Sequence, residues 1–393
     1  MPPDGALLGA YVDPDGRWSG VEAAKQDVRS LEQRLGRTLA IDHHFYAWTD
    51  AFPGPLERWD VEQGRIPLVT WEPWGTDLQS IASGAHDALI RQRAREVAAF
   101  GADVMLRLAH EMNGDWYPWS GDRNGGGTTG PQRYVAAWRR VHDLFEAEGA
   151  TNAVWVWAPN HVDVPQEPWN QWTSYYPGDA HVDWVGIDAY NWGRSQPWSS
   201  WTALADLIAP LYGDYAARKP LMVSETSSTE VGGDKAAWIA QARSDLKQRF
   251  PSVAGLVWFH VDKEQDWRID SSTAAFSAFR DLAHDPYFSG SSGGVKVLGG
   301  RAAVSDAVVA EVGRVSGVQP QRLSGPDRYA TAAAVVADAF PGRVPVVYVA
   351  TGEAFADALA GSAAAAVVDG PVLLVGHDHV PSATARQLDR STG

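Results

Sequence analysis

The residues most suited to chemistry lie between Met105 and Trp119, in the segment M-L-R-L-A-H-E-M-N-G-D-W-Y-P-W. It opens with a short apolar run, typical of a buried strand, and continues with His110, Glu111 and three aromatic residues. A carboxylic acid placed there can protonate a glycosidic oxygen, and aromatic faces can stack on sugar rings. The alternative is a surface loop with a stray glutamate, which would leave Trp116 and Trp119 in water without a partner. The segment therefore indicates carbohydrate chemistry.

A second carboxylic acid, Glu225, follows the apolar residues of P-L-M-V-S-E-T. Glycosidases that retain the anomeric configuration need two carboxyl groups about 5–5.5 Å apart, one as acid/base and one as nucleophile. We expect Arg107 to keep Glu225 ionised as the nucleophile. A dry pocket lined by tryptophan would keep Glu111 protonated as the acid/base. Taken singly, either glutamate could instead belong to a structural ion pair.

The elements that must position these acids are eight short apolar runs that alternate with amphipathic segments. The predicted strands are Ala6–Val12, Leu39–Phe45, Ile66–Trp71, Val104–Leu108, Ala153–Trp157, Val182–Asp188, Leu221–Ser224 and Ala254–His260. The predicted helices include Val21–Leu35, Asp87–Phe100, Pro131–Glu148, Trp201–Arg218 and Lys235–Phe250. This alternation predicts an α/β fold of the (β/α)8 TIM barrel type. A doubly wound open sheet fits less well, because no glycine-rich phosphate loop follows the first strand.

In such a barrel, active residues follow the carboxyl ends of the strands, so Glu111 and Glu225 would face each other across the mouth. Other polar and aromatic residues at strand ends are predicted to bind the substrate: His44, Trp71, Glu72, Trp74, Asn113, Trp119 and Trp192. His43 and His44 would point to opposite faces of their strand, so only one can line the cleft. H-E-M-N-G lacks the second histidine of the zinc motif H-E-x-x-H. We therefore expect no catalytic metal and no cofactor.

Composition separates the chain into two domains. All nineteen tryptophans lie between Trp18 and Trp267, and none occurs from Val295 onward. The intervening segment P-Y-F-S-G-S-S-G-G is typical of a flexible linker. We therefore expect a barrel over residues 1–285, a Gly/Ser linker over 286–294 and a smaller C-terminal α/β domain over 295–393. Apolar strands are predicted there at Val295–Leu298, Val344–Ala350 and Val372–Val375.

Charge and hydropathy exclude several classes of partner. The net charge of −15 argues against a nucleic-acid partner. No run approaches the ~20 apolar residues of a membrane span. Cysteine is absent, which excludes disulfides and thiolate metal sites. No signal peptide is visible at Met1, although we expect a secreted or cell-wall-associated protein.

The stretch R-L-A-H-E-M-N-G-D-W-Y-P-W resembles the acid/base motif of glycoside hydrolase family 26, and V-S-E-T resembles its nucleophile strand. The resemblance extends from about Leu7 to His284. It implies a (β/α)8 barrel that works by a retaining double displacement, with Glu111 as acid/base and Glu225 as nucleophile.

The same resemblance implies roles for the neighbours of the two acids. His110 would support the sugar and the catalytic pair, and Tyr190 would contact the nucleophile. Trp116 and Trp258 would form aromatic walls of the subsite where the bond breaks. These features predict a retaining endo-β-glycanase that acts on β-1,4 bonds of a cell-wall polysaccharide.

One motif bears on the substrate. Mannan-cleaving members of this family usually carry W-H after the third strand, whereas this chain has T-W-E-P-W, which includes Glu72. We therefore slightly favour mixed-linkage β-glucan of the lichenan type. Endo-β-1,4-mannanase activity is the alternative, and a non-catalytic glycan-binding surface protein is a weaker one.

The C-terminal phrases R-L-S-G-P-D-R-Y-A-T-A, V-Y-V-A-T-G-E-A-F-A-D-A-L-A-G and V-L-G-G-R-A-A-V-S-D-A-V-V resemble cell wall binding repeat 2. The last phrase normally closes a unit, but here it comes first. The segment is therefore either one permuted unit or part of a longer array. The resemblance implies attachment to a bacterial cell-envelope polymer, and a structural appendage without binding is the alternative.

Overall fold

The computed structural model describes residues 5–288, 295–316, 320–340, 342–367 and 370–392. Its backbone divides into two compact units, Met1–Gly293 and Gly294–Gly393. None of the helices in these described ranges is both long and apolar enough to cross a membrane.

The first unit is a closed barrel in which eight parallel strands pair in sequence order and the eighth pairs with the first. This confirms the predicted (β/α)8 architecture. The strands are β1 (Leu7–Asp13), β2 (Ile41–Ala47), β3 (Ile66–Glu72), β4 (Val104–Leu108), β5 (Ala153–Trp157), β6 (Trp184–Asn191), β7 (Leu221–Ser228) and β8 (Val253–Val261). Every predicted strand overlaps one of them, because each apolar run fills a strand that is buried on both faces.

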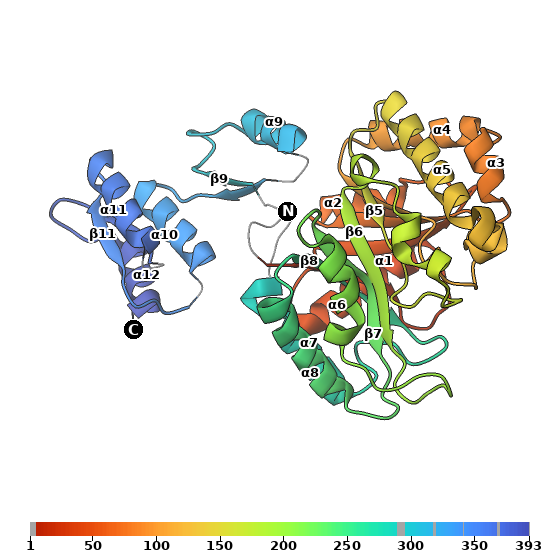
Figure 1. Cartoon of the computed structure of the whole chain (residues 1–393). Coiled ribbons are helices and arrows are strands. Elements are labelled where there is room, and N and C mark those ends of the chain that lie inside the picture. Colours follow the sequence, from red (N-terminus) through yellow and green to blue (C-terminus); the bar gives the residue numbers. More distant parts are fainter. Residues whose placement is uncertain (1–4, 289–294, 317–319, 341, 368–369, 393) are drawn as a thin grey trace. The chain divides into compact units, whose positions relative to one another are not determined.

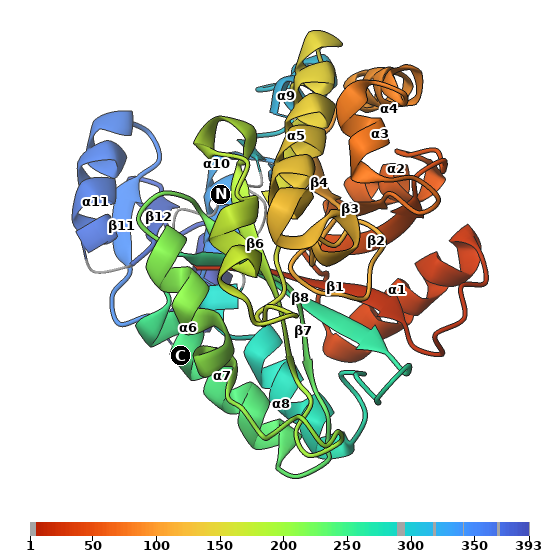
Figure 2. The ribbon, with the colours of Figure 1, turned by 45° about the vertical axis from the view of Figure 1, so that its right-hand side comes forward.

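Helices surround the strands (Figures 1 and 2). They are α1 (Val21–Leu35), α2 (Pro55–Glu62), α3 (Leu78–Ser83), α4 (Asp87–Phe100), α5 (Gly126–Ala147), α6 (Leu204–Tyr215), α7 (Lys235–Arg249) and α8 (Thr273–Ala283). Helices α1 and α4 have the predicted bounds. Helix α5 begins at Gly126 rather than Pro131, because the proline lies inside the helix, near its start, instead of opening it.

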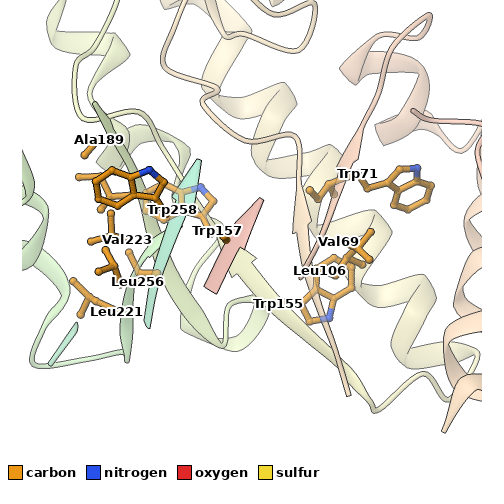
Figure 3. Close-up of a cluster of buried hydrophobic side chains, with 14 of the residues drawn as sticks. Val69, Trp71, Leu106, Trp155, Trp157, Ala189, Leu221, Val223, Leu256 and Trp258 are labelled. Carbon is orange, nitrogen blue, oxygen red and sulfur yellow. The ribbon is translucent and has the colours of Figure 1, made fainter. Parts of the chain in front are cut away.

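Two apolar layers hold the barrel together. The inner layer takes side chains from all eight strands: Leu7, Ile41, Leu68, Met105, Val156, Trp184, Met222 and Val257. The outer layer lies between strands and helices and contains Trp71, Trp155, Trp157 and Trp258 (Figure 3). Side chains alternate between the two faces of a strand. The positions two and four residues beyond the inner layer therefore point toward the mouth.

The predicted linker begins too early. Pro286–Phe288 form a short 3-10 helix, and Phe288 is fully buried. The Tyr287 carbonyl accepts a hydrogen bond from Ala6 N at 2.8 Å, which ties this turn to the start of β1. These three residues therefore pack as part of the barrel unit. The remainder of the predicted linker, residues 289–294, lies outside the described residues.

The second unit contains two small parallel sheets. Strands β9 (Lys296–Leu298) and β10 (Gln321–Leu323) form one, and β11 (Tyr348–Thr351) and β12 (Val372–Val375) form the other. Its helices are α9 (Asp306–Ser316), α10 (Arg328–Ala339), α11 (Phe355–Val367) and α12 (Ser382–Thr392). Ala333, Val336 and Leu373 form a small core. The unit is thus α/β, as predicted, although β10 was not anticipated.

Candidate active site

Arg107 lies at the centre of the mouth and is fully buried. Its Nη1 donates to both carboxylate oxygens of Asp188 at 2.8 Å, and its Nε donates to Thr70 Oγ1 at 2.8 Å. Its Nη2 donates to Glu225 Oε1. The cost of burying this cation is offset by the two carboxylates that bond to it. Arg107 therefore positions β3, β4, β6 and β7 around one charge.

Glu225 is 5% exposed and is held from two sides. Besides the bond from Arg107, its Oε2 accepts a hydrogen bond from Tyr190 Oη at 2.7 Å. The register between β6 and β7 shifts so that Asp188 pairs with Glu225, and Ser224 also donates to Asp188, at 2.7 Å. This irregularity turns two successive residues of β7 into the mouth. The Glu225 carboxylate is therefore fixed, with both oxygens bonded.

Glu111 reaches the mouth through an unusual backbone. Ala109 and Glu111 have φ values of 47° and 52°, a region that non-glycine residues adopt at a cost of about 1–3 kcal/mol. The Glu111 carboxyl accepts hydrogen bonds from Trp116 Nε1 at 2.8 Å and from Asn160 Nδ2 at 2.6 Å. Burial, together with the negative charge of Glu225, raises the pKa of Glu111 to about 7. Glu111 can therefore carry a proton near neutral pH.

His110 lies beside the acids and is buried. Its Nε2 is 3.2 Å from Tyr117 Oη, and its carbonyl accepts a hydrogen bond from Trp119 Nε1 at 2.7 Å. Burial and the charge of Arg107 hold the pKa of His110 well below its usual range. His110 is therefore neutral and can offer a hydrogen bond without adding charge to the mouth.

A cation is already present where a metal ion would bind. Ligand atoms of His110, Asp188 and Glu225 lie within 4.8 Å of one another, which is close enough to share an ion. The guanidinium of Arg107, however, donates to both carboxylates. The positive charge between these acids is thus supplied by the chain itself.

The predicted His44 does not line the mouth. Its Nε2 lies 2.7 Å from Asp60 Oδ2, on the side of β2 that faces α2. Its neighbour His43 points inward instead, with Nε2 2.7 Å from Thr70 Oγ1 and 3.3 Å from Arg107 Nη2. Strand alternation allows only one of the two to face the mouth, and it is His43.

The predictions for Trp71 and Trp258 were also wrong. Both are in the outer layer, at 0% and 1% exposure (Figure 3). Trp71 stacks on Trp48 with ring centroids 4.2 Å apart, and Trp258 packs edge-on against Phe279. Their strand neighbours Glu72 and Phe259 take the inward positions. These two tryptophans belong to the hydrophobic core and cannot touch a sugar.

Trp119 and Asn113 are buried beneath the mouth and do not reach substrate. Trp119 is 1% exposed and stacks on Tyr117 with centroids 4.3 Å apart. Asn113 donates to the Asn160 carbonyl at 2.9 Å and accepts from the Asn160 backbone N at 2.9 Å. Asn113 thus fixes the residue that donates to Glu111. Both are positioning residues and were wrongly predicted as substrate contacts.

Three predicted aromatic residues do border the mouth. Trp74 and Trp116 are 44% and 40% exposed. Trp192 is half-buried and contacts Trp198, which is 70% exposed, with ring centroids 5.3 Å apart. Exposed tryptophan faces of this kind are costly in water unless they bind an apolar surface such as a sugar ring. They are suited to form stacking platforms.

Glu72 also belongs to this rim. Its Oε2 accepts a hydrogen bond from Trp74 Nε1 at 3.0 Å. Burial raises the pKa of Glu72 to about 7. The nearby charge of Glu225 contributes in the same direction, which places Glu72 within electrostatic reach of Glu225. Glu72 therefore shares the mouth with Asp188, Glu225 and Glu111.

Several residues of the site were not in the predicted set. They are Asp188, Asn160, His43, Thr70, Tyr117 and Trp267. The first four could have been found from the alternation of side chains along a strand, because each follows an inward apolar position or stands at a strand end. Trp267 contacts Tyr190 and Trp192 from a loop after β8, and nothing in its local sequence indicated this.

A closed parallel barrel with two carboxylic acids and exposed tryptophans at the carboxyl ends of its strands has the features of a glycoside hydrolase. Residues 75–218 match the model of glycosyl hydrolase family 26, and residues 322–391 match that of cell wall binding domain 2. The chain therefore belongs to glycoside hydrolase family 26 and carries a cell wall binding domain 2 after the barrel.

Individual relatives agree with this assignment. The chain is 37% identical over 270 residues to Endoglucanase H of Acetivibrio thermocellus, across 68% of this chain and 30% of that protein. It is 29% identical over 191 residues to a mannan endo-1,4-beta-mannosidase of Bacillus subtilis, across 46% of this chain and 44% of that protein. The chain thus spans less than half the length of these curated relatives.

Solved structures agree on the fold. A family 26 beta-mannanase from Bacteroides ovatus superposes with a TM-score of 0.53 at 18% identity, across 72% of this chain and 90% of that one. A family 26 endo-beta-1,4-mannanase from Bacillus sp. JAMB-750 superposes with a TM-score of 0.53 at 18% identity, across 74% and 89%. At such identities the likeness concerns the fold alone.

Proposed function

We propose that the barrel is a retaining endo-β-glycanase that hydrolyses β-1,4 bonds, with Glu225 as nucleophile and Glu111 as acid/base. The observation that carries the proposal is the difference between the two surroundings. Glu225 is bonded to a cation and a phenol, whereas Glu111 is buried, receives only neutral donors and has a pKa raised to about 7. One acid is thus suited to attack and the other to protonate.

In the first step, a Glu225 oxygen bonds to the anomeric carbon as the glycosidic bond breaks. Glu111 gives its proton to the departing oxygen, so the leaving sugar departs as an alcohol. Tyr190 and Arg107 hold the attacking carboxylate, which limits the reorganisation that the reaction requires. Trp116 keeps the Glu111 carboxyl directed into the mouth.

In the second step, water attacks the anomeric carbon and Glu111 accepts its proton. The negative charge of Glu225 is one cause of the raised pKa of Glu111. An ester at Glu225 carries no charge, so this contribution disappears in the intermediate. The pKa of Glu111 then falls, and the residue changes from acid to base. The geometry thus supports both halves of a double displacement.

We favour mixed-linkage β-glucan as substrate by a small margin. Glu72 stands at the end of β3, where its carboxyl can accept hydrogen bonds from equatorial hydroxyls. The similarity to Endoglucanase H, whose name refers to glucan, also supports a glucan substrate. β-Mannan is the second candidate, because other relatives and the superposed structures are named as mannanases.

The test compares kcat/KM on barley β-glucan or lichenan with kcat/KM on locust bean gum and ivory-nut mannan. We expect a modest preference for the glucans, with β-configured reducing ends appearing first by proton NMR. A tenfold preference for mannan, equal to about 1.4 kcal/mol of transition-state binding, would reject the glucan assignment. Initial release of α-anomers would reject the retaining mechanism. Absence of turnover on all four would favour a glycan-binding protein.

We further propose the division into a barrel that ends with the turn Pro286–Phe288, a linker after it, and an envelope-binding domain over 295–393. The match to cell wall binding domain 2 supports a secreted or cell-wall-associated protein that binds a bacterial envelope polymer. Purified Gram-positive cell walls should retain the full chain, while a truncation before Val295 should remain in the supernatant. Equal retention of both would assign wall binding to the barrel.

A further inference from the structure

We propose that His142, Asp143 and His181 form a binding site for a zinc-type divalent metal ion, separate from the catalytic mouth. His142 and Asp143 lie near the end of α5, and His181 ends a short 3-10 helix, Asp179–His181, just before β6. Both positions precede the amino ends of β5 and β6. The site is therefore at the end of the barrel opposite the carboxylates Glu111 and Glu225.

Two of the three separations between the ligand atoms match those around a tetrahedral metal ion. Asp143 Oδ1 lies 3.3 Å from His142 Nδ1 and 3.4 Å from His181 Nε2. Zinc with bonds of about 2.0–2.1 Å places neighbouring ligand atoms about 3.3 Å apart. Direct N–H···O bonds are usually shorter, about 2.9–3.0 Å. The 3.3 Å contact of His142 with Asp143 is a long hydrogen bond, and all three ligand atoms lie within 4.8 Å of one another, so an ion that replaced the shared proton could bind all three.

The two imidazoles are held in place by the surrounding structure. His142 packs on Trp155 with ring centroids 5.2 Å apart. Trp138, one helical turn before His142, donates from Nε1 to the His181 carbonyl at 3.0 Å. The two histidine rings lie 4.8 Å apart. Helix α5 therefore fixes one ligand directly and the backbone of the other through Trp138, and such preorganisation favours metal binding.

The site is also accessible and can leave a coordination position for water. The side chain of Asp143 is 65% exposed, and those of His142 and His181 are 13% and 23% exposed. Arg139 is the nearby opposing charge, and its Nε is engaged by the Pro177 carbonyl at 2.8 Å. Two histidines and one carboxylate are ligands that zinc accepts, with water in the fourth position.

Two other groups of histidines and acids in the described residues are less suited. The group formed by His110, Asp188 and Glu225 already contains the cation Arg107. The group formed by Asp42, His44 and Asp60 is buried, and Arg65 lies 3.7 Å from Asp60. The surface site is therefore the one of these three groups that is open to solvent, and its ligands pair with one another rather than with a buried cation.

The experiment is a zinc titration of the tag-free full chain, after treatment with a chelator, by isothermal calorimetry. We expect one strong equivalent and a higher melting temperature with zinc, because the ion would join α5 to the segment before β6. Cobalt(II) should give the intense visible absorption of four-coordinate cobalt. The absence of binding heat and of a melting shift would overturn the proposal.

The test variants are Asp143→Asn and His181→Gln, and the matched control is Asp206→Asn. Loss of second-shell partners weakens metal affinity by about 10–100-fold, so loss of a ligand should weaken it at least tenfold. Asp206 is an exposed acid on α6 that belongs to none of the groups of histidines and acids found in the described residues, so its variant should bind zinc like the parent. Melting curves without metal should show that all three variants fold. Parental zinc affinity in both Asp143→Asn and His181→Gln would refute the site.

Discussion

The hydrogen bond from Trp116 to Glu111 should set the alkaline limit of activity, and Trp116→Phe tests this. Trp116 Nε1 donates to Glu111 Oε2 at 2.8 Å, which stabilises the charged carboxylate. Phenylalanine keeps an aromatic face for the sugar but removes the donor. The charged form of Glu111 then loses support, so its pKa should rise above the present value of about 7. Since Glu111 must be protonated to act as acid, activity should extend to higher pH.

The size of the shift follows from the geometry. A hydrogen bond to a charged group contributes about 1.5–3 kcal/mol. Trp116 is 40% exposed, so water can replace part of the lost donor. A remaining effect of about 1–1.5 kcal/mol corresponds to about one pH unit, since one unit equals about 1.4 kcal/mol. The alkaline limb should therefore move from about pH 7 to about pH 8.

The assay is kcat/KM on a soluble β-glucan or mannan across the pH range, whose alkaline limb reports the acid of the free enzyme. Trp192→Phe is the matched control, because Trp192 contacts Trp198 and Trp267 and should leave the limb in place. A lower plateau alone would reflect weaker sugar stacking. An unmoved limb in Trp116→Phe, or a limb moved to lower pH, would refute the assigned acid or its hydrogen bond.

Four further variants test the remaining assignments. Glu225→Ala should abolish turnover without loss of the folded state by circular dichroism, because no glycosyl-enzyme can form. Glu111→Ala should slow polysaccharide hydrolysis severely but spare aryl glycosides with good leaving groups; equal losses in kcat/KM would contradict its acid role. Trp74→Ala should weaken oligosaccharide binding by about 1–3 kcal/mol in calorimetry, with little change in melting. Trp119→Ala should instead cost about 3–5 kcal/mol of unfolding free energy in urea, and unchanged stability would contradict its burial.

The order of elements could be predicted because each strand is an apolar run between turns. It was harder to predict which side chains of a strand face the mouth, although the alternation of side chains along a strand carried part of this information. Glu72 and Trp71 are neighbours on β3, so they cannot both face the mouth. The same holds for His43 and His44 on β2. At β3 the polar residue, Glu72, could be expected to face the mouth and the apolar Trp71 the core. At β2 both residues are histidines, and His44 turns outward because it bonds to Asp60 on α2.

Other features depend on contacts between segments that lie far apart. The register shift that turns Glu225 inward arises where β7 pairs with β6 and β8. Ala109 and Glu111 have positive φ values although neither is glycine, so the residue types at these positions do not predict this backbone conformation. Asn113 looked like a sugar ligand because it follows Glu111 closely. Its side-chain amide instead donates hydrogen bonds to Asn160 and Asp163 in the loop after β5.

The distribution of charge in the mouth explains how two glutamates of the same type differ. Arg107 supplies one positive charge, which is shared between Asp188 and Glu225. His43 and His110 add none, because burial and Arg107 hold the pKa of each well below its usual range. Because one positive charge already faces the two carboxylates of Asp188 and Glu225, a further buried negative charge at Glu111 would add to the excess and is therefore costly. In the proposed mechanism the proton remains on Glu111 until Glu225 is esterified, and the loss of the negative charge of Glu225 then allows Glu111 to ionise. Arg107 thus links the protonation of one acid to the covalent state of the other.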